Sequence, residues 1–257
     1  MIEILSLLLV GVTAGTLAGL LGVGGGIIIV PSLVWIFHTQ LPASSLMHIA
    51  IGTSLATMAI TSISSIIAHH QRGAVLWSIV WQLSPGIIVG AFVGAIIADA
   101  LPTEILRKIF AIFILLASAQ LGLLPPAPHR QLPGSLSLAG TVIGQISALV
   151  GIGGGSLTVP FLVWFNIPIR NAVATSAACG FPIAVSGMIG FVVTGWHINT
   201  PWMIGYIYWP AFVAITPATL LFAPLGAKLA HTLPVSNLKK LFAIFLAGIG
   251  INMLIME

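Results

Sequence analysis

The sequence predicts an all-α polytopic membrane protein built from two pseudo-symmetric four-helix repeats. Three observations carry this prediction: very few charges, long apolar runs, and motifs that occur twice in the same order. Of the 257 residues, 58% are hydrophobic and only 5% are charged. Soluble domains carry about 25% charged residues, so this composition excludes a soluble globular domain.

The charge-free runs are long enough to span a bilayer. No charged residue occurs between Glu3 and Arg72, or between Arg170 and Lys228. A membrane helix needs about 20 apolar residues, and the alternating pattern of outer-membrane strands is missing. We therefore expect a multi-pass helical protein in the lipid bilayer of the inner (plasma) membrane. The net charge of +4 is too small to indicate nucleic-acid binding and fits a bias in cytoplasmic loops.

A glycine-rich motif occurs twice, at a fixed offset of 129 residues. Gly22-Val-Gly-Gly-Gly26 is followed by Pro31, and Gly151-Ile-Gly-Gly-Gly155 is followed by Pro160. The fourteen residues that begin at each motif share nine identities. Because so much glycine is unfavourable inside a helix, we expect the first helix of each repeat to be broken at its motif.

A second pair of matching segments indicates that the whole chain is a tandem duplication. Residues 101–113 and 233–245 share eight identities in thirteen positions. The predicted repeats are residues 1–122 and 134–257, joined by a proline-rich linker at 123–133. The apolar segments are expected at about 4–37, 44–69, 76–99 and 104–122 in the first repeat, and at about 136–165, 170–195, 200–230 and 236–256 in the second.

The topology depends on how the broken helices cross the membrane. If each crosses once, the repeats are parallel, and one side collects Arg107, Lys108, Arg170, Lys228, Lys239 and Lys240. The positive-inside rule then makes that side cytoplasmic and puts both termini outside. If each half-helix crosses separately, the repeats are inverted, as in many transporters. The distribution of cations favours the parallel arrangement.

The two glycine breaks are the first candidates for a binding site. Backbone N–H groups at the start of a half-helix can converge on an anion, because they are unsatisfied and the helix dipole is positive there. Matched breaks in two halves are typical of a transporter's binding site. The predicted ligand groups are Gly24, Gly25 and Gly26 in one copy and Gly153, Gly154, Gly155 and Ser156 in the other. The alternative is a tight helix crossing that binds nothing.

Polar side chains near the breaks are the next candidates. Thr53-Ser54 and Thr175-Ser176 lie in related strings of the second segments. Their hydroxyls could complete an anion's shell, or could bond to the carbonyl of the preceding turn. Gln145, six residues before the second break, is either a ligand or an interhelical contact. Because Ser156 aligns with Ile27, we expect the second repeat to supply the more polar wall.

Other patterns predict packing rather than chemistry. Glycines recur every fourth residue at Gly11, Gly15 and Gly19 and at Gly86, Gly90 and Gly94, a spacing that lets helices approach closely. The seven histidines have no Asp, Glu or Cys at ligand spacing. We predict no metal, cofactor or catalytic residue. An intramembrane hydrolase that uses Ser156 and His197 is a weak alternative, since G-x-S-x-G is not formed.

On these motifs the chain resembles the sulfite exporter TauE/SafE family, also called the 4-toluene sulfonate uptake permease family. The resemblance covers essentially the whole chain. It rests on the two glycine motifs with Pro31 and Pro160, on the Thr-Ser pairs, and on the Leu-Arg-Lys and Leu-Lys-Lys starts of the fourth segments. It implies a transporter that exports a small sulfur-containing anion, such as sulfite or an organosulfonate. Alternating access between the two repeats would be the mechanism, and an anion channel is the alternative.

Overall fold

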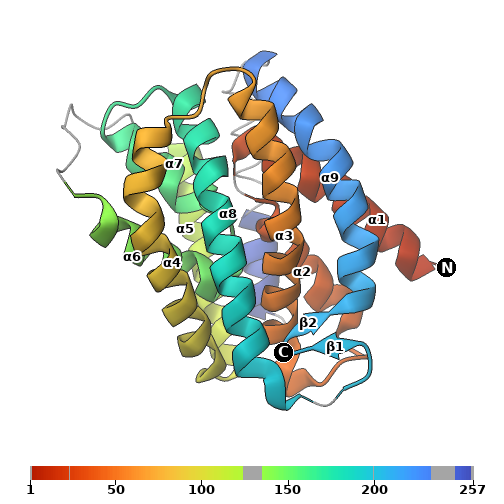
Figure 1. The fold of residues 1–257 in the computed structure, drawn as a ribbon. Helices are drawn as coiled ribbons and strands as arrows, with labels where there is room; N and C mark the ends of the chain where they lie inside the picture. Colours follow the sequence, from red (N-terminus) through yellow and green to blue (C-terminus); the bar gives the residue numbers. More distant parts are fainter. Residues whose placement is uncertain (1, 23, 124–134, 199, 233–246, 256–257) are drawn as a thin grey trace.

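The computed structural model is almost entirely helical (Figure 1) and describes residues 2–22, 24–123, 135–198, 200–232 and 247–255. The first half contains α1 (Ile2–Leu21), α2 (Gly26–Phe37), the 3-10 turn η1 (Ala43–Ser45), α3 (Leu46–His70), α4 (Trp77–Asp99) and α5 (Thr103–Leu123). The second half contains α6 (Ser137–Val150), α7 (Gly155–Trp164), α8 (Ile169–Thr194), η2 (Gly195–His197), β1 (Met203–Ile204), β2 (Ile207–Tyr208) and α9 (Trp209–Thr232). A further helical stretch covers 247–255.

The helices have the length and polarity of membrane spans. Within the described residues, five are long and apolar enough to cross a bilayer: α1, α3, α4, α8 and α9. Large apolar side chains stand exposed on their outer faces, for example Trp81 at 71%, Val89 at 59% and Leu221 at 69%. Contiguous apolar surface of this kind is covered by lipid in a membrane protein. The prediction of an all-α, multi-pass membrane protein is confirmed.

The helix boundaries follow the predicted segments, with one exception. The segment expected at 200–230 begins with a short β-hairpin, in which Met203 pairs with Tyr208 and Ile204 with Ile207. Its turn is closed by Gly205 at φ 55°, a left-handed conformation that glycine adopts without strain. The predicted linker and most of the last segment lie outside the described residues.

The two halves interleave. α3 and α8 pack against each other in the middle of the molecule, α4 packs along α6 on one flank, and α1 packs along α9 on the other (Figure 1). Each of these contacts joins a helix of the first half to one of the second. The centre is therefore shared by both halves and does not lie within either one.

Glycine ridges set the close spacing on the flanks. Gly11, Gly15 and Gly19 face α9, and Gly86, Gly90 and Gly94 face α6. A Cβ on Gly19 would lie 1.9 Å from the carbonyl oxygen of Ala223, and one on Gly90 would lie 2.0 Å from that of Thr141. No larger residue fits at these separations, so the predicted packing role of the ridges is confirmed.

α3 and α8 run in opposite directions. At the end that carries the hairpin (the hairpin end), His48 near the start of α3 stacks on Tyr206, which follows α8. At the other end (the turn end), Asn171 at the start of α8 donates to the carbonyl of Ala74, which follows α3. The expected parallel arrangement of the halves is therefore wrong.

The chain reverses direction at the first glycine break, and this explains the difference. α1 runs alongside α9 toward the turn end, since Gly11 faces Ala218 and Gly19 faces Ala227. α2 then returns to the hairpin end, where Phe37 packs edge-on against Tyr208 with ring centroids 5.1 Å apart. The broken segment therefore does not act as one continuous span.

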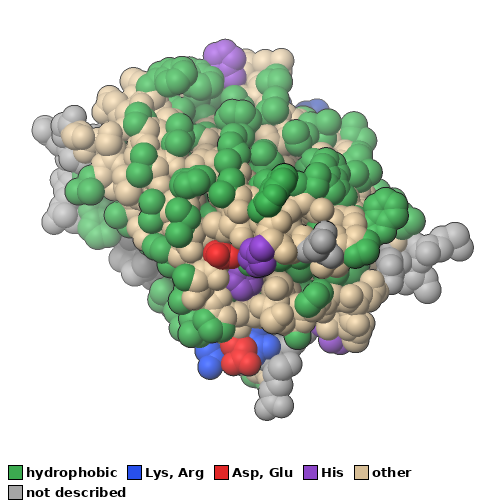
Figure 2. All heavy atoms as spheres, turned by 60° about the horizontal axis from the view of Figure 1, so that its bottom comes forward, with side chains coloured by type: hydrophobic (Ala, Val, Ile, Leu, Met, Phe, Trp, Pro, Cys, Tyr) green, Lys and Arg blue, Asp and Glu red, His purple; other side chains and the backbone are tan. Residues whose placement is uncertain are grey.

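This reversal also separates the cations. Arg107 and Lys108 lie near the start of α5 at the hairpin end, whereas Arg170 starts α8 and Lys228 lies near the end of α9, both at the turn end. Figure 2 shows the hairpin end, where acidic, basic and histidine side chains gather. The prediction that these cations share one side is wrong. The expectation that both termini lie outside, which followed from it, is therefore no longer supported. Lys239 and Lys240 lie outside the described residues.

Candidate binding site at the glycine breaks

The two glycine breaks touch each other in the middle of the molecule. A Cβ on Gly24 would lie 3.1 Å from the Cα of Gly153, and a Cβ on Gly26 would lie 2.1 Å from the carbonyl oxygen of Gly151. The structure thus brings together candidate residues that are 129 positions apart in the chain. The contact is backbone to backbone, which only glycine permits at this distance.

Each break is held by one serine from the opposite half. Ser54 Oγ on α3 donates to the carbonyl of Gly151 at 3.0 Å, and Ser176 Oγ on α8 donates to the carbonyl of Gly22 at 3.1 Å. Both serines are fully buried. Neither bond runs to the preceding turn of its own helix; together they form a crossed pair that ties the two breaks to the two central helices.

The neighbouring threonines make a second crossed pair. Thr53 Oγ1 accepts a hydrogen bond from the N–H of Tyr208 at 2.9 Å, just before α9. Thr175 Oγ1 accepts one from the N–H of Leu76 at 3.0 Å, just before α4. These contacts fix where α9 and α4 begin. All four predicted hydroxyls thus bind protein groups here, and their role as anion ligands remains a prediction.

The second break presents free hydrogen-bond donors. Among the hydrogen bonds of the described residues, none uses the backbone N–H of Gly153, Gly154, Gly155 or Ser156 as donor. Helix starts leave such N–H groups unsatisfied, and α7 begins at Gly155. Ser156 Oγ and Thr158 Oγ1 are also buried without a hydrogen-bond partner in the described structure. Buried polar groups are nearly always paired, so this cluster has the capacity to bind a ligand.

A small, partly open cavity lies against the first break, between α1, α3 and α8. Small residues leave the space: Ala18, Gly22, Gly24, Ala177 and Gly180. The α3 wall consists of Met58, Thr61, Ser62 and Ser65. These hydroxyl residues were not among the predicted ligands, although the Thr-Ser-Ile-Ser-Ser run at 61–65 inside an apolar span is a visible signal.

Two glycines that line the cavity lie next to backbone nitrogens of the second break. A Cβ on Gly24 would lie 3.5 Å from the backbone nitrogen of Gly153, and a Cβ on Gly180 would lie 3.9 Å from that of Gly154. Both Gly24 and Gly180 line the cavity. Backbone nitrogens of the second half therefore lie next to a cavity that hydroxyls of the first half line.

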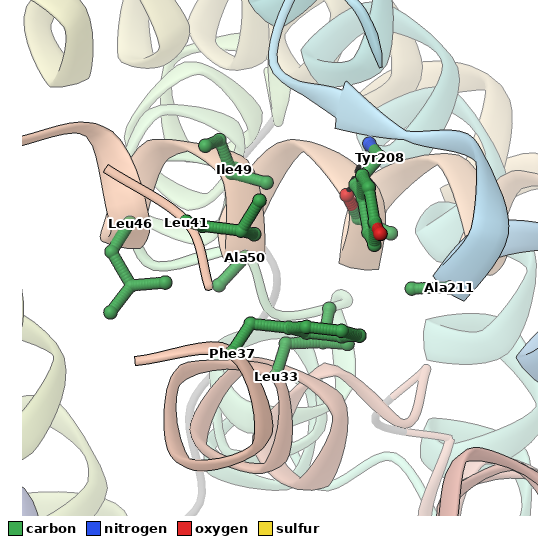
Figure 3. Close-up of a pocket in the computed structure, with 9 residues that line it drawn as sticks. Leu33, Phe37, Leu41, Leu46, Ile49, Ala50, Tyr208 and Ala211 are labelled. Carbon is green, nitrogen blue, oxygen red and sulfur yellow. Dashed lines mark hydrogen bonds between the residues drawn. The ribbon is translucent and has the colours of Figure 1, made fainter. Parts of the chain in front are cut away.

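A second small cavity lies near the hairpin end and has a different character (Figure 3). Leu33 and Phe37 of α2 face Tyr208 across it, with Ile49 and Ala50 of α3 beside them. The remaining lining residues are Leu41, Leu46, Thr53 and Ala211. Thr53 is thus placed toward this apolar cavity, which offers an anion little to bind.

Two other predicted features lie apart from the breaks. Gln145 lies where α6 contacts α4, and its backbone carbonyl oxygen would be 2.4 Å from a Cβ on Gly94. His197 lies in η2 at the hairpin end, with Nδ1 2.9 Å from the carbonyl of Thr194. Ser156 Oγ has no hydrogen-bond partner within the described structure, so the two residues do not form the pair that a serine hydrolase needs.

Comparison with known proteins identifies the family. The sequence profile named "Sulfite exporter TauE/SafE" matches residues 7–253. A "probable membrane transporter protein" of Haemophilus influenzae is 41% identical over 97% of both chains. Proteins with the same kind of name from Methanocaldococcus jannaschii and Bacillus subtilis are each 29% identical over more than nine tenths of both chains. No solved structure matches. With a profile match that spans nearly the whole chain, and with its paired glycine breaks in an all-helical membrane fold, this protein belongs to the sulfite exporter TauE/SafE family.

Proposed function

We propose that this transporter exports a small sulfur-containing anion, such as sulfite or an organosulfonate, across the inner membrane by alternating access. The observation that carries the proposal is the meeting of the two glycine breaks, where unpaired N–H groups lie next to the glycines of a cavity that buried hydroxyls also line. N–H groups at a helix start favour anions. The sulfur chemistry comes from the family, which is named for sulfite export.

The helix contacts support two inverted repeats, at residues 1–122 and 134–257. The pairing of α1 with α9 has its counterpart in α6 with α4, and the pairing of α4 with α8 has its counterpart in α9 with α3. The crossed serine and threonine bonds exchange in the same way. An axis that relates the halves would pass between α3 and α8, beside the breaks. Inverted repeats commonly rock around a site at their interface.

In this proposal the glycines and the central hydroxyls have separate tasks. The N–H groups of Gly153 to Ser156 hold the anion's oxygens, and Gly24 to Gly26 form the opposite wall. Thr53, Ser54, Thr175 and Ser176 hold the breaks in place and share their oxygens with the anion when the repeats move. An inside-negative membrane potential favours anion export by about 2.3 kcal/mol per charge per 100 mV.

A transport assay tests the proposal. The purified full-length chain is reconstituted in proteoliposomes loaded with radiolabelled sulfite or methanesulfonate, and efflux is followed with and without unlabelled anion outside. We expect saturable efflux that external anion stimulates by counterflow. Gly248→Ala is a control, because a Cβ at this position meets nothing within 4 Å. Efflux without counterflow would indicate the channel alternative, and no flux of any sulfur anion would contradict the proposal.

A further inference from the structure

We propose that the cavity at the first glycine break binds the singly charged form of an oxyanion, and that the Ser65 hydroxyl is one of its donors. This inference rests on the proposed transport function and specifies its site and its ligand. It depends on three observations: the position of the cavity, the unpaired Ser65 hydroxyl, and the neutral lining.

The cavity lies where the halves meet. Its walls come from α1, from the first break, from α3 and from α8. The backbone nitrogens of Gly153 and Gly154 lie just behind two of its glycines, Gly24 and Gly180. A ligand in this space would contact both repeats at once, which is what a transported substrate must do if the repeats move around it.

Ser65 is the lining hydroxyl whose proton is free. Thr61 Oγ1 donates within the protein, to Thr57 O at 2.9 Å or Thr219 Oγ1 at 2.6 Å, and Ser62 Oγ donates to Ala59 O at 3.1 Å. Ser65 is only 3% exposed, and its Oγ has no hydrogen-bond partner among the described residues. Leaving a buried hydroxyl unpaired is unfavourable, so a ligand that accepts this proton would remove the penalty.

The cavity lining carries no ionisable side chain among the residues that the structure describes. The nearest ionisable groups on the lining helices are His69, one turn beyond Ser65 with Nε2 3.0 Å from Gly19 O, and the buried Cys179, next to Gly180. The desolvation cost of an ion grows with the square of its charge, and hydrogen-bond donors or a charge of opposite sign must offset it. Hydroxyl and N–H dipoles can offset this cost for one negative charge, whereas a dianion has a much larger cost and finds no fixed cation in the lining.

Three sulfur oxyanions test this charge selectivity. Methanesulfonate is a monoanion across the neutral range, sulfate is a dianion, and sulfite changes from monoanion to dianion as the pH rises through neutrality. Proteoliposomes with the same buffer on both sides are assayed at slightly acidic and slightly basic pH. We expect constant methanesulfonate flux, sulfite flux that falls with its monoanion fraction, and little sulfate flux.

The alternatives give different results. If titration of His69 controlled transport, methanesulfonate flux would also change with pH, and this would overturn the inference. Sulfate flux equal to that of methanesulfonate, or sulfite flux that rises with pH, would overturn it while leaving the proposed transport function intact. Absence of flux for all three anions would contradict both this inference and the proposed transport function.

Ser65→Ala tests the donor. We expect the KM for methanesulfonate to rise roughly tenfold or more, the loss expected for one hydrogen bond to a charged ligand. Its thermal midpoint without ligand should be equal to or above that of the wild type, because the variant loses an unpaired buried hydroxyl. Ser64→Ala is the matched control, since Ser64 Oγ is exposed and donates to Leu220 O at 3.0 Å outside the cavity. An unchanged KM in Ser65→Ala would overturn the role of Ser65. The charge selectivity is measured on the wild-type protein and does not depend on this variant.

Discussion

The two glycine breaks share one sequence motif but have different conformations. In the first break, Gly22, Gly24 and Gly25 have φ of 67°, 80° and 79°. In the second, only Gly151 is left-handed, at φ 71°, and Gly154 has the ordinary helical φ of −54°. The first break therefore needs glycine for its backbone angles, whereas the later glycines of the second serve mainly to leave room.

The polar groups around the breaks differ in a complementary way. Ser156 and Thr158 follow the second break, where Ile27 and Ile29 follow the first. The central helices reverse this preference, because the α3 hydroxyls Thr61, Ser62 and Ser65 correspond to Ile183, Ala184 and Gly187 on α8 when the Thr-Ser pairs are aligned. Each half therefore supplies one polar wall. The expectation that the second half is more polar applies only to α7 compared with α2.

The contact between the breaks should be the most sensitive feature. In Gly26→Ala the new Cβ would start 2.1 Å from Gly151 O, so the breaks must separate by about 1 Å or more to reach normal contact. We expect transport to be lost and the free energy of unfolding to fall by more than about 3 kcal/mol. Proteoliposome flux and denaturant titration measure the two effects. Wild-type flux in this variant would show that the breaks need not touch.

The difference in backbone angle predicts a smaller, unequal effect at two aligned positions. Gly25→Ala forces a left-handed alanine and places its Cβ 2.9 Å from Ala14 O, which together should cost about 2–4 kcal/mol of stability. Gly154→Ala keeps a helical φ and meets its nearest atoms at 3.1 Å, so we expect a loss of about 1 kcal/mol or less.

Gly73→Ala separates strain from crowding, because Gly73 has φ 65° and nothing within 4 Å of a Cβ. Its thermal midpoint should fall between those of the Gly154 and Gly25 variants. Equal midpoints for Gly25→Ala and Gly154→Ala would contradict the prediction that only the first break requires a left-handed glycine at this position.

The sequence was sufficient to predict the helices and the breaks, because both depend on local composition. Charge-free runs indicated the spans, and the glycine clusters indicated where α1 and α6 end. The direction of the second half was not predictable in this way. It depends on the chain reversing between α1 and α2, and a glycine motif allows a bend of any angle.

The site was predicted in part for the same reason. The glycines were recognisable because they are duplicated, and the structure brings them together. Ser65 has no duplicate, since Gly187 stands at the matching position, so the repeated motifs do not indicate it. The partners of Ser54 and Ser176 lie 97 and 154 residues away, and contacts at such separations leave no local signal in one sequence.

The connections between the central helices and the helices that follow differ too. Within the part of the chain that the structure describes, only the second half has a hairpin there, and Tyr206 in it donates to Asp99 Oδ1 at 2.7 Å. Tyr206→Phe should lower the free energy of unfolding by about 1.5–3 kcal/mol, the range for a hydrogen bond to a charged group. Asp99→Asn keeps an acceptor and should lose less. Equal stability of Tyr206→Phe and wild type would show that the hairpin is not fastened by this bond.

The same bond predicts a pH dependence. Burial, then the hydrogen bond to Asp99 and its negative charge, raises the pKa of Tyr206. The folded state therefore holds the phenol proton more tightly than the unfolded state, whose pKa is about 10. The stabilisation is complete below that pH and is lost only as the pH rises above it. The stability difference between wild type and Tyr206→Phe should thus be constant across neutral pH and shrink in strong alkali.

The crossed serines give the smallest effect and the most direct test of equivalence between the halves. Ser54 and Ser176 are both fully buried and donate over 3.0 and 3.1 Å to carbonyls of the opposite break. Ser54→Ala and Ser176→Ala should each lower the free energy of unfolding by about 1 kcal/mol, or somewhat more if the carbonyl stays unpaired.

If the bonds are independent, the double variant should lose the sum. Because the breaks touch, we expect a smaller loss than the sum: once one serine is removed, its break shifts and weakens the other contact. Chemical denaturation of the four proteins measures this coupling. Strict additivity would mean that the breaks are held separately and that the contact between them transmits nothing.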